Sequence, residues 1–229
     1  MQRQMIEPGV AVATSRVADY VQLVKPRIAT MAMVAVAVGF LVGSRGEVKI
    51  LPLLSSCFGI LCIAASCNFL NQWYEQDTDQ RMRRTADRPV AGGRIPAGEV
   101  FVVGLVLASI GNLWLWLTVN VVTCVLAAIT LAIYVCAYTP LKRVSCLCTV
   151  LGAVAGALPP VLGWTAAGGQ LDGGAASLFL LLFFWQFPHF LAIATIYRDD
   201  YEAADLKMLP LLSDRRNCAG AVGVVYACA

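Results

Sequence analysis

The sequence predicts an all-helical membrane protein, built as a polytopic bundle of transmembrane helices. Hydrophobic residues make up 59% of its 229 residues and charged residues only 14%, against roughly 25% charged in a typical soluble domain. The charged residues are spaced so that long stretches of the chain contain none of them. Because these stretches are apolar throughout, they favour helices over the strands of an outer-membrane barrel, in which polar and apolar residues would alternate.

The charge-free stretches place the helices along the chain. They cover residues 28–44, 50–74, 100–141, 144–171, 173–197 and 217–229. A spanning helix needs about 20 apolar residues, so the run 100–141 must hold two helices, and we expect the turn between them near Thr118, Val119 and Asn120. This predicts six complete spans in a single membrane-embedded domain, 1–229. The run 217–229 is too short to cross a bilayer and is expected to begin a seventh helix, with the later C-terminal helices missing.

The basic residues predict how the bundle is oriented. All lysines and arginines except Arg45 and Lys49 lie in the N-terminal segment, the loop 75–99, the turn 140–145 and the loop 198–216. By the positive-inside rule these segments, and the N-terminus with them, are cytoplasmic. Residues 1–19 contain neither the apolar core of a cleavable signal peptide nor a transit-like presequence, so we expect a multi-pass protein of a bacterial inner (cytoplasmic) membrane.

Charge also narrows the class of function. The net charge of +3 and the absence of a basic stripe exclude a nucleic-acid-binding protein. Ten of the 14 acidic residues fall in two of the cytoplasmic segments. These residues are Glu75, Asp77, Asp79, Asp87 and Glu99 in one segment and Asp199, Asp200, Glu202, Asp205 and Asp214 in the other.

Asn71, Glu75 and Asp79 are spaced four residues apart, so they share one face if the second span continues past the membrane surface. Side-chain oxygens on one face suit Mg²⁺, which combines one or two carboxylates with substrate phosphates. Arginines follow at once, and their planar guanidinium groups match phosphate oxygens. Two such faces opposed across a bundle could clamp one diphosphate. The alternative is an ordinary charged loop beside a membrane helix, with carboxylates that neutralise the arginines.

Four motifs in order resemble the heme O synthase family of the UbiA prenyltransferase superfamily. The segment 71–89, NQWYEQDTDQRMRRTADRP, resembles the family's first motif, including the R-T-x-x-R-P ending. The others are K-P-R at 25–27, Y-T-P-L-K-R at 138–143 followed by G-A-L-P-P at 156–160, and W-Q-F-P-H-F at 185–190 followed by D-D-Y at 199–201 and M-L-P at 208–210. The family often has Asp where this chain has Glu75, and the superfamily fold has nine helices.

The resemblance implies the transfer of a farnesyl group from farnesyl diphosphate to a vinyl group of heme B, with Mg²⁺ as cofactor. It implies as partners the two substrates, the lipid bilayer and a downstream heme A synthase or oxidase assembly factor. The catalytic residues would be Asn71, Glu75, Asp79 and Asp200, and the Mg²⁺ ligands these four and Asp199. The diphosphate would contact Arg83, Arg84, Arg88, Lys142 and Arg143, and the heme acceptor His189, Tyr138 and Trp185.

Several alternatives remain at this point. His189, the only histidine, lies in the sixth span, where it could be a neutral group bonded to a neighbouring helix, a heme contact or ligand, or a proton carrier. Another UbiA-type enzyme acting on a quinone precursor would share the acidic helices but not the R-T-x-x-R-P and W-Q-F-P-H-F motifs. A transporter would place acidic gates near the bilayer midplane, whereas here they lie at helix ends. An inactive truncated fragment or a non-enzymatic assembly protein is the remaining possibility.

Overall fold

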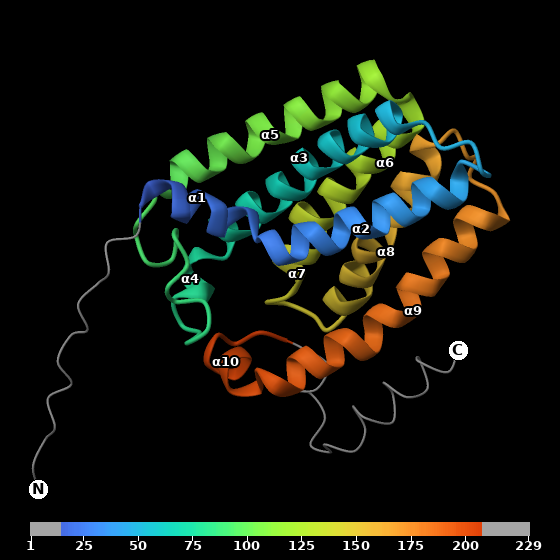
Figure 1. The fold of residues 1–229 in the computed structure, drawn as a ribbon. Helices are drawn as coiled ribbons and strands as arrows, with labels where there is room; N and C mark the ends of the chain where they lie inside the picture. The colour runs from blue at the N-terminus through green and yellow to red at the C-terminus, as the bar shows by residue number, and fades with distance from the viewer. Residues whose placement is uncertain (1–14, 208–229) are drawn as a thin grey trace, which may run out of the picture.

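The computed structural model describes residues 15–207 as a bundle of helices (Figure 1). The elements are α1 (Arg16–Val24), α2 (Pro26–Gly43), α3 (Ile50–Tyr74), α4 (Gln76–Asp79), α5 (Ala97–Thr118), α6 (Val121–Ala132), the π-helical turn η1 (Ile133–Tyr138), α7 (Thr139–Leu141), α8 (Cys148–Ala166), α9 (Gly173–Ile196) and α10 (Arg198–Ala203). Residues 15–207 contain no strand, so the predicted all-helical class is confirmed.

Six helical segments in the described range are long and apolar enough to cross a membrane. They are Pro26–Gly43, Ile50–Tyr74, Ala97–Thr118, Val121–Leu141, Cys148–Ala166 and Gly173–Ile196. The predicted division of the run 100–141 is confirmed, because α5 ends at Thr118 and α6 begins at Val121. The Asn120 side chain caps α6 by accepting from the backbone N–H of Thr123 at 2.8 Å. The expected seventh helix at 217–229 lies outside the described residues.

A short helix, α1, precedes the first span and was not predicted from the sequence. The αL backbone of Lys25 (φ 54°) breaks the chain between α1 and α2, and Pro26 starts α2 at a position where a missing N–H is harmless. Two ion pairs hold α1 to the following segments. Arg94 Nε lies 2.7 Å from Asp19, and Arg16 lies 2.6 Å from Glu99. α1 therefore positions Lys25 beside the end of α3.

The centre of the bundle is α8, whose spanning window is 72% buried. Glycines let α2 approach it closely, since a Cβ at Gly39 would overlap the carbonyl oxygen of Pro160 and a Cβ at Gly163 would overlap that of Val36. Close backbone contact of this kind is typical of membrane helices, whose association depends on van der Waals packing. The close packing of α2 against α8 fixes where α2 begins, directly after Lys25 at the polar end of the bundle.

Candidate active site

The polar end of the bundle is built on the junction between α3 and α4. Glu75 lies between the two helices as the cap of both. Its backbone N–H donates to the carbonyl of Asn71 at 2.8 Å, and the N–H of Asp79 donates to the carbonyl of Glu75 at 2.8 Å. The one-turn spacing therefore continues across the junction. Asn71, Glu75 and Asp79 are 2%, 7% and 1% exposed, so the face that they were expected to share points into the protein.

Both carboxylates of this face are paired with basic residues from other segments. Lys142 Nζ donates to Glu75 Oε1 at 2.8 Å. Arg88 Nη1 donates to both carboxylate oxygens of Asp79, at 2.8 and 2.7 Å. Lys142 follows α7 and Arg88 lies in the loop between α4 and α5, so three parts of the chain meet here. Two of the predicted diphosphate ligands thus contact two of the predicted metal ligands.

The buried charges perturb each other's pKa values. Burial acts to raise the pKa of Glu75, but the charge and hydrogen bond of Lys142 outweigh it and hold that pKa below its ordinary value. Burial works against the charged form of Lys142, yet the Glu75 carboxylate keeps the pKa of Lys142 well above 10.5. At Asp79 burial prevails over Arg88, so the pKa of Asp79 is raised. Burial and the nearby Arg88 charge lower the pKa of Lys25 to about 7.

Asn71 joins this cluster to two residues for which the sequence suggested no role. Lys25 Nζ donates to Asn71 Oδ1 at 3.2 Å, and Asn71 Nδ2 donates to Thr139 Oγ1 at 3.3 Å. Lys25 and Thr139 both lie within motifs that resemble the family, in K-P-R and Y-T-P-L-K-R. That position in a motif was the only sequence signal that could have identified them, since neither is an acidic or arginine residue beside the first cluster.

The described part of the second acidic segment, residues 198–207, lies at the same end of the bundle (Figure 1), and Asp214 lies outside the described residues. The backbone N–H of Arg83 donates to Asp200 Oδ1 at 3.1 Å, which joins α10 to the loop after α4. The backbone N–H of Lys207 donates to the carbonyl of Lys142 at 2.8 Å. Asp199, by contrast, is exposed. The two predicted acidic segments are therefore in contact, through a carboxylate and a backbone N–H.

The remaining predicted diphosphate ligands surround this end with exposed positive charge. Arg84 lies over the ring of Tyr197, 4.3 Å from its centroid. Arg143 lies 5.5 Å from the centroid of Tyr74. The side chains of Arg83, Arg84 and Arg143 are all exposed. An arginine that lies over an aromatic ring can still direct N–H groups at its edge to an anionic ligand, although Arg143 Nη2 also donates to Thr78 Oγ1 at 3.5 Å.

The chemistry of the donors fits Mg²⁺ at the Asn71, Glu75 and Asp79 face. One amide oxygen and two carboxylates are hard donors, and they project from consecutive turns. Within residues 15–207 no three His, Cys, Asp or Glu side chains come together as a metal cluster, so a bound ion would take its remaining ligands from water or substrate phosphates. That ligand set is the one that Mg²⁺ commonly uses.

The three residues predicted to contact the heme acceptor lie in two different parts of the structure. Tyr138 is buried, and Lys142 Nζ lies 4.5 Å from the centroid of its ring. Tyr138 therefore adjoins the buried group that we call the polar cluster, which consists of Asn71, Glu75, Asp79, Arg88 and Lys142. Trp185 and His189 stack on each other, with ring centroids 4.8 Å apart. Both are exposed, on a face of α9 that the described helices leave uncovered. The side chain of Gln186, in contrast, faces Gly156 of α8.

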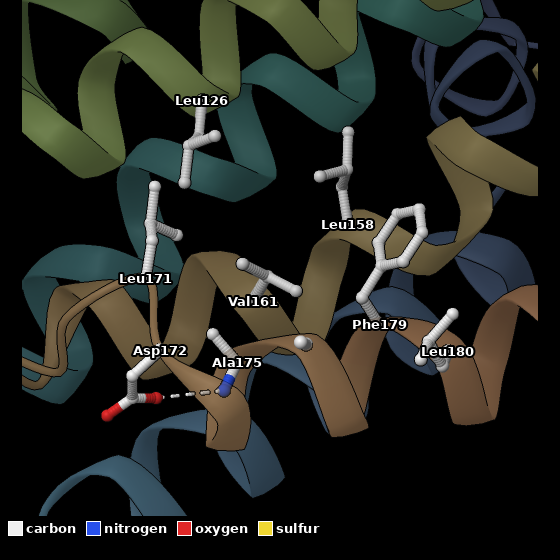
Figure 2. Close-up of a pocket in the computed structure, with 9 residues that line it drawn as sticks. Leu126, Leu158, Val161, Leu171, Asp172, Ala175, Phe179 and Leu180 are labelled. Carbon is white, nitrogen blue, oxygen red and sulfur yellow. Dashed lines mark hydrogen bonds between the residues drawn. The ribbon is translucent and has the colours of Figure 1, made fainter.

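An apolar pocket lies near the opposite end of α9 (Figure 2). It encloses about 360 Å³ among side chains of α6, α8 and the start of α9. The carboxylate of Asp172 at its edge is occupied as the cap of α9, accepting from Gly174 and Ala175 at 3.0 and 3.2 Å. Its lining is Leu126, Leu158, Val161, Leu171, Asp172, Ala175, Ala176, Phe179 and Leu180. This pocket is separate from the polar cluster and has the character of a hydrocarbon site.

Known proteins with similar sequences are curated as prenyltransferases. The chain is 40% identical over 221 residues to the protoheme IX farnesyltransferase of Solibacter usitatus (strain Ellin6076), a match that covers 92% of this chain and 75% of that one. It is 42% identical over 226 residues to the protoheme IX farnesyltransferase of Koribacter versatilis (strain Ellin345), covering 96% of this chain and 71% of that one. The chain thus spans about three quarters of these relatives.

Solved structures share the fold at low sequence identity. A digeranylgeranylglyceryl phosphate synthase superposes with a TM-score of 0.74 at 17% identity, over 93% of this chain and 75% of that chain. A UbiA homolog from Archaeoglobus fulgidus bound to GPP and Mg²⁺ superposes with a TM-score of 0.71 at 16% identity, over 91% and 76%. The model of the UbiA prenyltransferase family matches residues 32–229. By sequence and by fold, the chain belongs to the UbiA prenyltransferase family.

Proposed function

We propose that this protein transfers the farnesyl group of farnesyl diphosphate to a vinyl group of heme B, with water adding to the other vinyl carbon and diphosphate leaving, so that the hydroxyethylfarnesyl chain of heme O forms. The observation that carries the proposal is the identity of about 40% to protoheme IX farnesyltransferases over nearly the whole chain. The R-T-x-x-R-P and W-Q-F-P-H-F segments support heme B as the acceptor, because the resemblance to heme O synthases rests on them.

Departure of an allylic diphosphate needs its negative charge stabilised in a site with little water. We assign this task to the polar end of the bundle, where Asn71, Glu75 and Asp79 would hold Mg²⁺, and Asp199 and Asp200 of the second acidic segment would supply further ligands. The ion would neutralise the leaving diphosphate when bound. Binding of a cation at Glu75 and Asp79 would replace the charge that Lys142 and Arg88 supply to them in this structure.

The basic residues would then serve the anionic substrate. Lys142 and Arg88 lie 2.8 and 2.7 Å from the carboxylates, and once Mg²⁺ held these carboxylates the two cations would be released to contact diphosphate oxygens. Arg83, Arg84 and Arg143 would contact the diphosphate from the exposed side. Catalysis of this kind asks the protein for positioning and charge stabilisation rather than for covalent chemistry.

The acceptor side of the site would involve Tyr138, Trp185 and His189. Tyr138 lies against Lys142, so its aromatic ring would lie beside the proposed diphosphate. Trp185 and His189 form a flat stacked pair on α9, a surface that suits contact with a planar macrocycle. The polar cluster would face the cytoplasm of a bacterial inner membrane, as the distribution of Lys and Arg indicates.

Membranes that contain the protein should convert heme B and farnesyl diphosphate to heme O only in the presence of Mg²⁺, with the product identified by its mass. A parallel reaction with an aromatic quinone precursor tests the second UbiA-type function. If the quinone precursor were prenylated and no heme O formed, the quinone precursor would replace heme B as the proposed acceptor. No prenylated product from either acceptor would contradict a prenyltransferase function for the chain.

A further inference from the structure

The turn that directly precedes Thr139 has an unusual backbone. η1 is a π-helical turn over Ile133–Tyr138, and the backbone N–H of Thr139 bonds to the carbonyl of Tyr134 five residues earlier. The Thr139 hydroxyl donates to the same carbonyl at 2.8 Å. Single π-helical turns within α-helices are often found at functional sites. Here the turn fixes the hydroxyl of a threonine that is 1% exposed and lies against Asn71.

The direction of the Thr139 hydrogen bonds determines the orientation of the Asn71 amide. A hydroxyl has one hydrogen and two acceptor lone pairs. Since the hydrogen goes to the Tyr134 carbonyl, the Thr139 oxygen can only accept from Asn71. The amide nitrogen must therefore face Thr139, at 3.3 Å, and the amide oxygen must face the other way.

Lys25 agrees with this orientation from the opposite side. In its ammonium form Lys25 can only donate, and its Nζ donates to Asn71 Oδ1 at 3.2 Å. A flipped amide would set its N–H groups against the ammonium and its oxygen against the lone pairs of Thr139. Because Asn71 is 2% exposed, water could not relieve these contacts, and both would cost free energy.

The orientation matters because only one end of an amide can bind a cation. The amide oxygen carries a second lone pair beyond the one that Lys25 uses, whereas the nitrogen has no acceptor capacity. Asn71 lies one turn before Glu75, whose carboxylate is the next oxygen donor on the same face. Loss of a partner that orients a metal ligand typically lowers metal affinity by roughly 10- to 100-fold.

We propose that Thr139 is a positioning residue that holds the Asn71 amide with its oxygen toward the charged cluster, and so sets the affinity of the site for Mg²⁺ and diphosphate. This proposal rests on the proposed prenyltransferase function. It requires that the site bind a diphosphate with Mg²⁺, and it does not depend on which acceptor receives the prenyl group.

The test is the binding of inorganic pyrophosphate to the purified full chain in detergent, titrated calorimetrically at several Mg²⁺ concentrations. Thr139→Val keeps the shape of the side chain but cannot accept from Asn71, and we expect it to weaken Mg²⁺-dependent binding about tenfold. Thr139→Ser keeps the hydroxyl and should bind as the wild type does. Asn71→Ala should bind weakly, and adding Thr139→Val to it should cause little further loss, because the residue to be positioned is gone.

Three results with the variants would overturn the proposal. They are wild-type binding by Thr139→Val, equal weakening by Thr139→Ser, and additive losses in the double variant, since a general packing role would give additive losses. Absence of Mg²⁺-dependent pyrophosphate binding by the wild-type chain would overturn it as well. Failure of heme O formation with intact pyrophosphate binding would contradict the acceptor alone, so the two proposals are tested separately.

Discussion

A single nitrogen of Arg88 bridges both carboxylate oxygens of Asp79, at 2.8 and 2.7 Å. Asp79 is 1% exposed and Arg88 is 20% exposed along its side chain, so the pair is shielded from solvent on the Asp79 side. Burial raises the pKa of Asp79 in spite of the charge and hydrogen bonds of the arginine. The loop after α4 is held to the bundle by the same contact.

Replacing Arg88 by Ala should destabilise the protein by about 3 kcal/mol, since it leaves a buried carboxylate without its cation. The measurement is the thermal midpoint of the ligand-free protein in detergent. Arg83→Ala is the matched control, because the Arg83 side chain is exposed and its contact with Asp200 uses the backbone N–H. Equal thermal midpoints for Arg88→Ala and Arg83→Ala would show that the Asp79–Arg88 ion pair does not stabilise the protein more than an exposed arginine does.

Asp79→Asn should reduce heme O formation to background while the protein remains inserted in the membrane. The change keeps the shape of the side chain but removes the charge that we assign to Mg²⁺ binding. Asp77→Asn, two residues away and exposed, should keep the activity of the wild type. Heme O is measured by mass in membranes with matched amounts of each protein. Wild-type turnover by Asp79→Asn would refute the assignment.

The Glu75–Lys142 pair predicts a defined dependence of stability on pH. The pKa of Glu75 is lowered on folding, so its contribution is present above 4.5 and is lost as the pH falls through the folded value. The pKa of Lys142 is raised, so its contribution is present below 10.5 and is lost as the pH rises through the folded value. The pair should therefore stabilise the protein most between these limits.

Lys142→Met tests this pH window. We expect the variant to be about 3 kcal/mol less stable than the wild type at pH 7, because Glu75 is then buried without a partner. The difference should shrink as the pH approaches 4. Thermal unfolding of both proteins across this range, without ligand, gives the comparison, and a difference that does not vary with pH would contradict the ion pair.

Gly163→Ala should disrupt the contact between α2 and α8. Its new methyl group would overlap the backbone carbonyl of Val36, which a side-chain movement cannot relieve. We expect a loss of monodisperse protein after detergent extraction. Gly98→Ala is the control, because a Cβ there meets no atom of residues 15–207 within 4 Å and alanine favours the helix. Similar yields from the two variants would argue against the close crossing.

His189→Ala should change the Soret band of heme B bound to the protein, if the histidine contacts or ligates the iron. The stacked ring of Trp185 provides a second probe, since Trp185→Ala should weaken heme binding through lost ring contact and leave the ligation unchanged. An unaltered Soret band in His189→Ala at full heme occupancy would exclude ligation, and the histidine would then act as a packing partner of Trp185.

The sequence by itself determined the number of spans, the turn between α5 and α6 and the one-turn register of Asn71, Glu75 and Asp79. These features depend on local composition and helical periodicity, which neighbouring residues set without reference to the rest of the chain. The placement of both acidic segments at one end of the bundle followed in the same way, because an even number of spans separates them. Helix α1 was missed because it is too short and too polar to stand out.

Only the tertiary structure decided which residue partners which. Glu75 meets Lys142 and Asn71 meets Thr139 across more than 60 positions of sequence, and the spacing of neither pair indicates contact. These pairings depend on how closely the helices pack, as α2 does on α8 and α3 on α5, and on the π-helical turn that precedes Thr139. Packing is a property of surfaces that meet after the helices have formed, so it cannot be read from the periodicity of any one of them.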